Sequence, residues 1–331
     1  MTASDFRLNP SRRTLVGTAA GLAVLSALGR AVSQPKLPLI KIVCGYAAGG
    51  TSDLLSRRVA ANMPAGYAGA IVVENRPGAL AQVSVSHVKN QPADGSSILS
   101  VSSVLFTLFP FIYKTLPYNA DEFVTLTTGC EVEYGYAVGP LVPASVRSIE
   151  DYVAWVKRDA RHATFASAGV LPSMVGALLG KMGSVAMVPV TYPGGAPAVL
   201  DTASGNVPAV VSTLGDLAPH LKEGKLRLLA ITSDKRNPLV PAAPTFAEQG
   251  IADMVIKTYF GFFVHAKTPP EVMASHSAAL RAALGKKDVA DALAQVGMTI
   301  VPYDIKQSVE LMTADRARWA AIVKRLDYQP S

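Results

Sequence analysis

The sequence has few of the residues that carry catalytic or metal chemistry. Its 331 residues include two cysteines and five histidines. No two histidines lie three to five residues apart, and no carboxylate pair accompanies one at metal-ligand spacing, so a zinc or iron site is not expected. A G-x-S-x-G nucleophile elbow is missing too, and neither cysteine has an evident histidine partner. These absences favour a protein that binds a molecule without converting it, and without a metal ion or cofactor.

A strong charge of one sign is also lacking. The chain carries 31 Lys and Arg against 24 Asp and Glu, a formal net charge of +7. Part of this excess belongs to residues 1–33, which contribute four arginines and one aspartate. No basic cluster marks a surface for nucleic acid or for a membrane, so neither is expected as a partner.

The N-terminus has the features of an export signal. Residues 11–15 read Ser-Arg-Arg-Thr-Leu, a twin-arginine pattern, and an apolar and small-residue run follows at residues 15–28. This run is too short and too rich in Gly and Ala to span a bilayer, which takes about 20 apolar residues. Ala31 and Ser33 suit cleavage before residue 34. We predict a twin-arginine signal peptide over residues 1–33 and a periplasmic protein. A membrane anchor is the alternative, and a lipoprotein anchor is excluded because no cysteine lies near the cleavage point.

The two cysteines leave one question open. Cys44 falls in the first predicted strand and Cys130 lies far along the chain. In an oxidising periplasm they could pair, but the sequence does not show that their side chains approach. A disulfide and two buried free thiols are both compatible with the sequence.

The most informative stretch runs from residue 39 to residue 63. Residues 39–44 are mostly apolar and β-branched and predict a buried strand. Residues 45–50 form a glycine-rich turn, after which Thr51 or Ser52 is expected to cap a helix. A strand, a glycine loop and a helix N-terminus present main-chain N–H groups and the positive end of a helix dipole, which together favour an anion.

Phosphate nucleotides fit this loop poorly. The glycine spacing resembles a phosphate loop, but position 51 is threonine where that motif requires lysine, and G-x-G-x-x-G is not spelled. A carboxylate needs only one or two main-chain donors and is the more plausible guest. The alternative is an ordinary α/β turn with glycine for steric reasons. Asp53, in the first helical turn, either serves the helix dipole or fixes the loop against a ligand.

The same strand–loop–helix plan recurs along the chain and predicts an α/β fold with two lobes. Strands are expected near residues 39–44, 70–74, 97–103, 163–166, 185–190, 207–211 and 227–232, with extended crossing segments at 132–138 and 255–264. Helices are expected near residues 83–89, 148–156, 173–182, 198–203, 272–284 and 288–296, with a last helix capped by Asp304 and Gln307. A Thr268–Glu271 capping box is expected to start the helix at residues 272–284. Trp319 in that helix is expected to be core. Residues 34–135 with 262–331 would form lobe 1, and residues 136–261 would form lobe 2.

Small-residue loops follow several of these strands, where ligands bind in such sheets. Ser102 and Ser103 end the third strand, and their hydroxyls either face the crevice or cap the next helical turn. Residues 167–169 and 192–197 form two further loops in the second lobe.

Taken together, these residues resemble the Bug family, the periplasmic solute receptors of tripartite tricarboxylate transporters. The likeness covers nearly the whole chain after residue 33. It rests on stretches at residues 46–53, 74–79, 93–95, 116–118, 165–169, 192–197, 224–227 and 244–250, whose joint order is specific although each is weak alone.

The resemblance implies a hinged periplasmic binding protein of type II with two strands crossing between the lobes. It also implies a small carboxylate held by main-chain amides and ordered water, and a membrane permease as partner. We expect a monomer. The ligand-binding residues expected by match, together with Asp53 and Ser212, are Tyr46, Ala47, Ala48, Gly49, Gly50, Thr51, Ser102, Ser103, Ser167, Ala168, Gly169, Tyr192, Gly194, Gly195, Ala196 and Pro197.

Some positions depart from the family pattern. Gly45 stands where proline is common, and Ser212 stands where an aspartate is common, which would remove a charge from the cleft. Phe106 and Phe109 stand where polar residues are usual, which suggests a less polar ligand such as an aromatic monocarboxylate. We predict a solute receptor rather than an enzyme. A ligand sensor for a signalling system, and a periplasmic hydrolase using Asp53 or a serine, are the alternatives.

Overall fold

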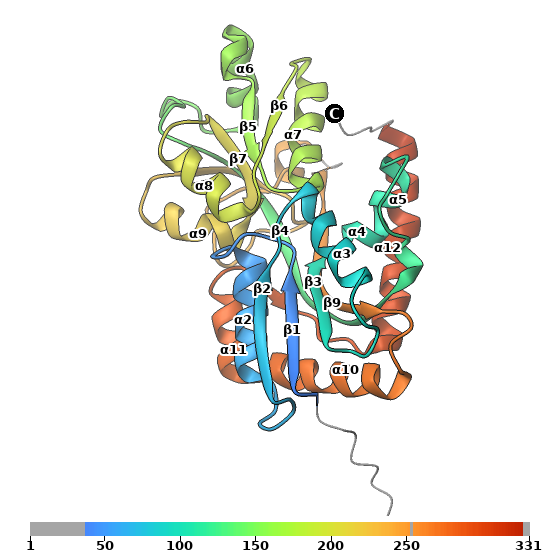
Figure 1. Ribbon diagram of the computed structural model, residues 1–331. Coiled ribbons are helices and arrows are strands. Elements are labelled where there is room, and N and C mark those ends of the chain that lie inside the picture. Colours follow the sequence, from blue (N-terminus) through green and yellow to red (C-terminus); the bar gives the residue numbers. More distant parts are fainter. Residues whose placement is uncertain (1–36, 252–253, 327–331) are drawn as a thin grey trace, which may run out of the picture. The chain divides into compact units, whose positions relative to one another are not determined.

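The computed structural model describes residues 37–251 and 254–326. The predicted signal peptide, residues 1–33, lies outside the described residues. Ten strands form a mixed sheet in the order β2-β1-β3-β9-β4-β7-β5-β6, with β8 and β10 also pairing with β4 (Figure 1). The strands are β1 (Leu39–Cys44), β2 (Ala70–Asn75), β3 (Ser97–Ser102), β4 (Phe123–Val138), β5 (Thr164–Ser167), β6 (Val188–Thr191), β7 (Ala209–Thr213), β8 (Arg227–Ile231), β9 (Lys257–His265) and β10 (Thr299–Ile300).

The long strand β4 joins two parts of this sheet. Residues 123–133 of β4 pair with β9, and residues 130–131 pair with β10. The end of the same strand, residues 134–138, pairs with β7 and β8. We call β1, β2, β3, β9, β10 and the start of β4 the first sheet half. The end of β4 with β5, β6, β7 and β8 is the second sheet half.

Each half carries the parallel β/α pairing that the sequence predicts. In the first half β1 pairs in parallel with β2 and β3, and in the second β5 pairs in parallel with β6 and β7. The main helices are α2 (Thr51–Asn62), α3 (Gln82–Lys89), α4 (Val104–Thr107), α5 (Phe109–Ile112), α6 (Ile149–Arg158), α7 (Val170–Gly183), α8 (Gly195–Ala203), α9 (Leu214–Lys222), α10 (Pro270–Leu284), α11 (Lys287–Ala294) and α12 (Ile305–Leu326).

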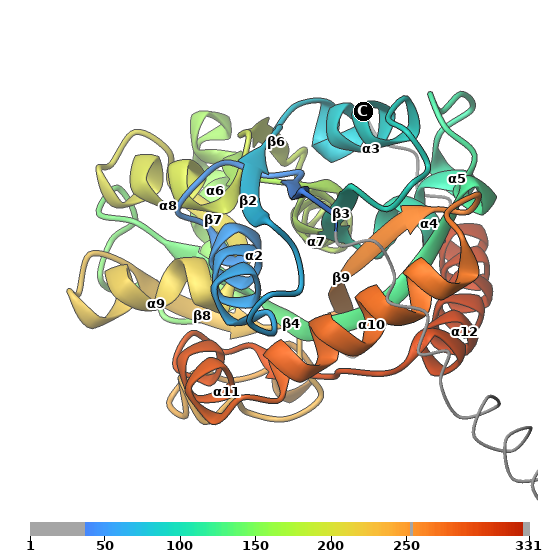
Figure 2. The ribbon, with the colours of Figure 1, turned by 60° about the horizontal axis from the view of Figure 1, so that its bottom comes forward.

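Alternation along the strands divides the core of the first sheet half into two layers. Ile42 and Ile98 face one side, where they pack with residues of α2, α10 and α11 (Figure 2). Val43 and Leu99 face the other side and pack with residues of α3, α4 and α12. Because successive side chains of a strand point to opposite faces, a strand buried on both faces is apolar throughout, as residues 39–44 nearly are.

Several element boundaries differ from the prediction. Strand β4 starts at Phe123, well before the predicted residue 132. The prediction missed residues 123–131 because Gly129, at φ 63°, lies in an irregular stretch where the register with β9 shifts. Helix α7 starts at Val170 instead of 173, and helix α9 was not predicted. The Asp304 and Gln307 cap of α12 is confirmed, with Gln307 N donating to Asp304 Oδ1 at 2.8 Å. Trp319 is fully buried, as predicted.

Two predicted helix caps are wrong. Helix α2 is capped by Gly50 without a side-chain hydrogen bond, and Thr51 is its first residue. The Thr268–Glu271 capping box expected before α10 does not form, because Pro269 is the N-cap and makes no side-chain cap bond. None of the helices in the described ranges has the length and apolar character needed to cross a bilayer.

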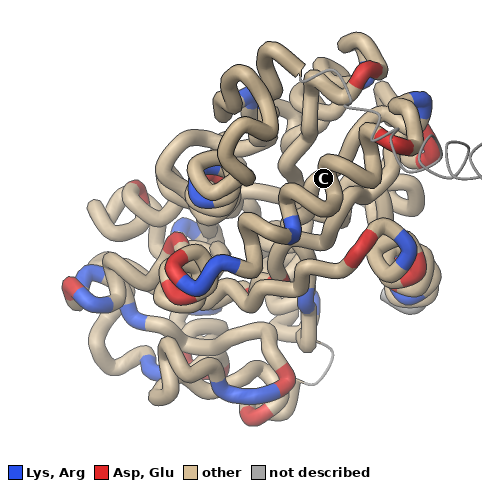
Figure 3. The backbone as a smooth tube through the Cα atoms, turned by 90° about the horizontal axis from the view of Figure 1, so that it is seen from below, with Lys and Arg blue, Asp and Glu red and all other residues tan. Residues whose placement is uncertain are grey.

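Acidic and basic residues are interspersed along the chain. Figure 3 shows Lys and Arg next to Asp and Glu in several of the visible segments. Many pair directly, as Lys257 does with Glu131 at 3.2 Å and with Asp234 at 3.3 Å. A surface with both signs mixed in this way does not create a one-sided field.

A buried histidine on α10 makes the stability of the fold depend on pH. His276 is 1% exposed, and its ring nitrogens contact the hydroxyl of Tyr67 at 2.7 Å and the carbonyl oxygen of Gly95 at 2.9 Å. Burial lowers the pKa of His276 below its usual value of about 6.5. The unfolded chain therefore takes up the proton first. Stability from the neutral ring is present above pH 6.5 and is lost as the pH falls below it.

We expect the melting temperature to fall between pH 7.5 and pH 5.5 and the fall to be shallower in His276→Gln, whose amide does not titrate. Thermal unfolding of both proteins across this range measures the difference. Parallel curves for the two proteins would show that another group sets the pH dependence.

Candidate functional site

An acidic side chain from the first turn of α2 holds the first glycine loop, residues 45–50. Asp53 is 3% exposed, and its Oδ2 accepts from the main-chain N–H of Gly49 at 3.0 Å and from Arg57 Nε at 2.9 Å. Asn75 donates to Oδ1 at 2.8 Å. Burial alone would raise the pKa of Asp53, but these hydrogen bonds from Arg57, Gly49 and Asn75 lower it. Asp53 thus lies in the first turn of α2 and also holds the loop through Gly49, and its role toward a ligand stays a prediction.

The first loop touches the loop that follows β6. The N–H of Ala47 donates to the carbonyl oxygen of Pro193 at 3.2 Å. A Cβ atom added to Gly194 would lie 2.9 Å from the Cβ of Ala47. Glycine at 194 therefore lets two loops from different sheet halves meet, which brings together two of the three loops that the sequence singled out.

A carboxylate that the sequence analysis missed bridges the same two halves. Asp216 of α9 accepts at Oδ1 from the main-chain N–H of Thr51 at 2.7 Å and lies 2.8 Å from the Thr51 hydroxyl. Its Oδ2 accepts from the hydroxyls of Ser212 and Thr213, each at 2.9 Å. We call this set of contacts among Thr51, Ser212, Thr213 and Asp216 the Asp216 bridge.

The Asp216 bridge corrects one expectation. Ser212 in place of an aspartate was expected to leave the cleft without a charge, yet the carboxylate of Asp216 lies on the Ser212 hydroxyl. The signal was present in the sequence as Thr213-x-x-Asp216 before an apolar residue, the pattern of a helix N-terminus. Thr213 is indeed the N-cap of α9.

Two cavities flank the loop contact. A small one, of about 30 Å³, lies at the Asp216 bridge. A larger one, of about 270 Å³, lies on the other side of Tyr46 and Ala168, which line both. The remaining residues that line the larger cavity are Gly78, Ala79, Leu80, Ala81, Thr191, Tyr192 and Pro193.

The larger cavity is bordered by an unusual turn. Ala79, Leu80 and Ala81 all have positive φ, at 45°, 55° and 73°. Non-glycine residues rarely adopt this conformation, and such strain gathers at functional sites. No local pattern predicts this turn, because alanine and leucine do not favour positive φ.

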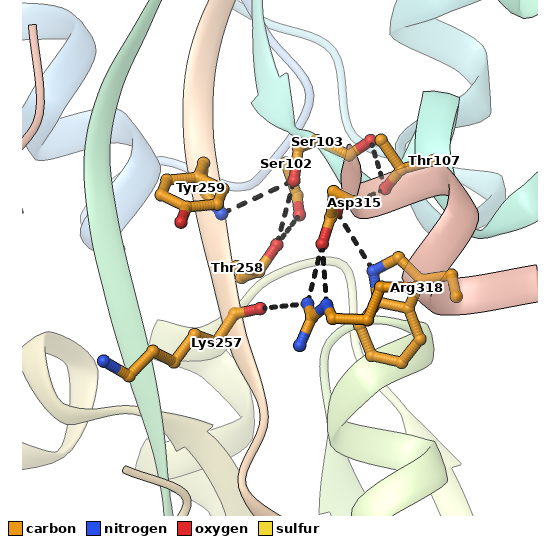
Figure 4. A network of polar contacts seen from close by, with 9 residues as sticks. Ser102, Ser103, Thr107, Lys257, Thr258, Tyr259, Asp315 and Arg318 are labelled. Atoms are coloured by element: carbon orange, nitrogen blue, oxygen red, sulfur yellow. Dashed lines mark hydrogen bonds and ion pairs between the residues drawn. The ribbon is translucent and has the colours of Figure 1, made fainter. Parts of the chain in front are cut away.

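The predicted serines at the end of β3 do not line either cavity. The hydroxyls of Ser102 and Ser103 each lie 3.2 Å from that of Thr258 on β9. Figure 4 shows them in a polar network that continues to Asp315 and Arg318 of α12. Ser103 is the N-cap residue of α4 but makes no side-chain cap bond, and neither serine lines these two cavities, so their role as ligand contacts stays a prediction.

Tyr46 connects this network to the first loop. Burial raises the pKa of Tyr46, whose hydroxyl group is hydrogen-bonded to Ser102. Its ring packs edge-on against Phe260, with 5.5 Å between the centroids. Tyr46 is thus a predicted site residue that lines both cavities and also contacts β3 and β9.

The other predicted residues fall into two groups. Gly50, Thr51, Ala168, Gly195 and Ser212 line the small cavity, and Tyr192 lines the large one. The remainder line neither of these two cavities and lie in the loops, at the end of β5 or in the first turn of α8: Ala47, Ala48, Gly49, Ser167, Gly169, Gly194, Ala196 and Pro197. Among these, the Ser167 hydroxyl contacts that of Ser173 at 2.8 Å.

The two phenylalanines expected to make the ligand site less polar lie elsewhere. Phe106 packs against Phe263 with 4.6 Å between ring centroids, and Phe109 packs against Tyr113 at 5.0 Å. Phe106 lines a separate cavity of about 280 Å³ beside α12. The reason for expecting an aromatic ligand is therefore removed. A further groove of about 490 Å³, between α6 and α7, contains no predicted site residue.

Both cysteines are free and fully buried. The sulfur of Cys44 lies 3.5 Å from the Ser52 hydroxyl, and that of Cys130 lies 3.5 Å from the sulfur of Met298. In the part of the chain that the structure describes, no three His, Cys, Asp or Glu side chains gather so that they could hold a metal ion.

Two sheet halves joined through β4, with glycine loops meeting between them, form a fold that solved periplasmic binding proteins share. The structure titled "Structure of periplasmic binding protein BugD" superposes with a TM-score of 0.83 at 24% identity, covering 90% of this chain and all of that one. R. palustris Rpa4515 with adipate gives a TM-score of 0.81 at 25% identity, covering 88% and 98%. The predicted fold class is confirmed.

The family model described as "Tripartite tricarboxylate transporter family receptor" matches residues 55–328. The chain belongs to this family, and the predicted resemblance is confirmed. A relative from Pseudomonas sp. (strain P51), the UPF0065 protein in the tcbD-tcbE intergenic region, is 27% identical over 319 residues, which is 94% of this chain and 93% of the relative.

Proposed function

We propose that this receptor is exported by the twin-arginine route, captures a small aliphatic carboxylate in the periplasm between its two sheet halves, and delivers it to a membrane permease. The observation that carries the proposal is the membership of a transporter-receptor family over residues 55–328. Rpa4515, at 25% identity, is titled with adipate. The lobe boundaries near residues 135 and 261 remain a prediction, and a hinge between them is part of the proposal.

We place the ligand in the cavity of about 270 Å³ next to the meeting loops. No residue lining it is charged, so an acid group there would have to be held by main-chain amides and hydroxyls. Ala168 lines it, and among the described residues its main-chain N–H has no protein acceptor. Water expelled on closure would strengthen each of these hydrogen bonds.

A ligand panel tests this proposal. We expect adipate or malate to raise the melting temperature in proportion to ligand concentration, because a ligand that binds only the folded protein stabilises it by mass action. Benzoate should have a smaller effect, since the two phenylalanines lie outside the cavity. Native mass spectrometry of protein taken directly from the periplasm would weigh any retained acid. Stabilisation by benzoate but by neither aliphatic acid would contradict the proposed ligand class.

The same panel separates a receptor from a hydrolase. Ser212 donates to Asp216 at 2.9 Å, but among the described residues no histidine hydrogen-bonds to this pair to act as a base. We expect each acid to be recovered unchanged after incubation. A transport receptor and a ligand sensor differ in the protein that they bind. Co-purification with a permease subunit would support transport, and co-purification with a signalling protein would support sensing.

A further inference from the structure

We propose that Asp216 is a built-in anion that occupies the N-terminus of α2 in place of a ligand's acid group and so holds the two sheet halves together. It is a positioning residue that restricts where the ligand's acid group binds. The inference rests on the solute-binding function proposed above, because it assumes halves that separate and rejoin around a ligand.

The contacts of the Asp216 bridge carry the inference. Asp216 lies on α9 in the second sheet half, whereas Thr51 opens α2, 165 residues earlier in the chain. The main-chain N–H of Thr51, at 2.7 Å, is one of the unpaired donors that every helix N-terminus presents, and the helix dipole favours a negative charge there. A protein carboxylate already fills this position.

The carboxylate has no acceptor capacity left for a ligand. Four groups able to donate lie within 2.9 Å of its two oxygens, and a carboxylate accepts at about four sites. Asp216 therefore does not serve to bind an amine or a hydroxyl of the ligand. Its partners from both sheet halves fix it as a link between them.

The surrounding glycines leave room for this link. A Cβ atom on Gly195 would lie 1.8 Å from Asp216 Oδ2, and one on Gly215 would lie 2.7 Å from the Thr51 hydroxyl oxygen. Capping of α9 explains the contact between Asp216 and Thr213, but it requires neither these glycines nor Thr51. The geometry thus fits a bridge between the halves better than a helix cap alone.

The bridge also restricts the ligand. In the first loop the N–H of Gly49 donates to Asp53 and the N–H of Thr51 donates to Asp216. Two main-chain donors next to this loop are thus taken by the chain's own carboxylates. The ligand's acid group must bind to other donors, or it must displace Asp216.

Chemical rescue tests the inference. Spin labels at Arg161→Cys and Lys287→Cys report the distance between the halves, because these side chains are 89% and 87% exposed whereas Cys44 and Cys130 are buried. In the labelled full chain without added acid, Asp216→Ala should raise the ratio of separated to joined molecules at least about tenfold, a change of about 1.4 kcal/mol. Sodium formate, which supplies a free carboxylate, should restore the joined distance in Asp216→Ala but not alter the wild type.

Controls make each outcome decisive. Glu223→Ala, at the end of the same helix, should leave the distance unchanged, and sodium chloride at equal ionic strength should not replace formate. If Asp216→Ala does not fold, Asp216→Asn replaces it, because asparagine keeps the shape of the side chain without the charge. The distance between the spin labels in Asp216→Asn then tests the bridge. Suppose that the spin-label distances are equal in the wild type and the variant, and that adipate or malate shifts them in both. This result would overturn the bridge but would still support a hinge between the sheet halves. No change in any protein with any acid would instead contradict the hinged function itself.

Discussion

Replacing Gly195 with alanine is expected to lower the affinity for the organic acid at least about tenfold while changing the melting temperature by only a few degrees. The added Cβ would lie 1.8 Å from Asp216 Oδ2 and 2.7 Å from the Ser212 hydroxyl oxygen, so the carboxylate must move away. Gly195 is the first residue of α8 and its φ is not in the left-handed region, so alanine suits the helix itself. The substitution should therefore weaken the contact between the two sheet halves, and with it the affinity for the acid, more than it weakens the fold.

A neighbouring glycine supplies the matched control. A Cβ on Gly50 would lie 3.4 Å from Asp216 Oδ1, an ordinary contact, so Gly50→Ala should bind almost normally. Calorimetric titration of both variants with the acid that binds best in the panel measures the difference. In the double variant Gly195→Ala with Asp216→Ala, the clash with the carboxylate is removed and only the 2.7 Å contact with the Ser212 hydroxyl oxygen remains. The loss of affinity in the double variant should therefore be smaller than the sum of the two single losses. Equal affinities of Gly195→Ala and the wild type would exclude Gly195 and Asp216 from closure.

Local patterns made the fold predictable. Residues 39–44 form a strand buried on both faces and were nearly all apolar for that reason. The end of β4 was found, but its start was not, because the irregular stretch around Gly129 breaks the alternation that marks a strand. Helix α9 was missed because Pro219 lies inside it, a residue that normally ends a helical pattern.

The candidate site was less predictable because its contacts join distant residues. The glycine loops could be found, since each is a local signal, and Ala47 and Pro193 do meet. The partner of Thr51 lies 165 residues away, and nothing local to Asp216 shows that it reaches another helix. Ser102 and Ser103 also have contacts that no local pattern showed. Their position at a strand end suggested a ligand, but their hydroxyls lie against Thr258 of β9.

The network of Figure 4 anchors the C-terminal helix, and Asp315 is its centre. Asp315 is 5% exposed and accepts from Thr107 Oγ1 at 2.8 Å, Trp319 Nε1 at 3.1 Å and Arg318 at 2.7 Å. Through Arg318, which also donates to the carbonyl oxygen of Lys257 at 3.2 Å, the network reaches the start of β9. It therefore connects α12 to the strand that follows the second sheet half in sequence.

Replacing Asp315 with alanine is expected to lower the free energy of unfolding by about 3 kcal/mol. The buried Trp319 Nε1 would lose its acceptor, and the Thr107 hydroxyl would keep only the longer bond of 3.3 Å to the carbonyl oxygen of Ser103. An unpaired buried donor costs about 1–3 kcal/mol. Arg318 adds less, because its side chain is 39% exposed and water replaces part of the interaction. Urea denaturation measures the change.

Asp304→Ala on the same helix is the matched control, since it removes an exposed cap and should cost only about 1 kcal/mol. Arg318→Ala should fall between the two, because it leaves the Thr107 and Trp319 bonds to Asp315 intact. If Asp315→Ala cost no more than Asp304→Ala, the network would not be what holds α12 against the sheet, and the apolar packing of Trp319 would have to carry that role.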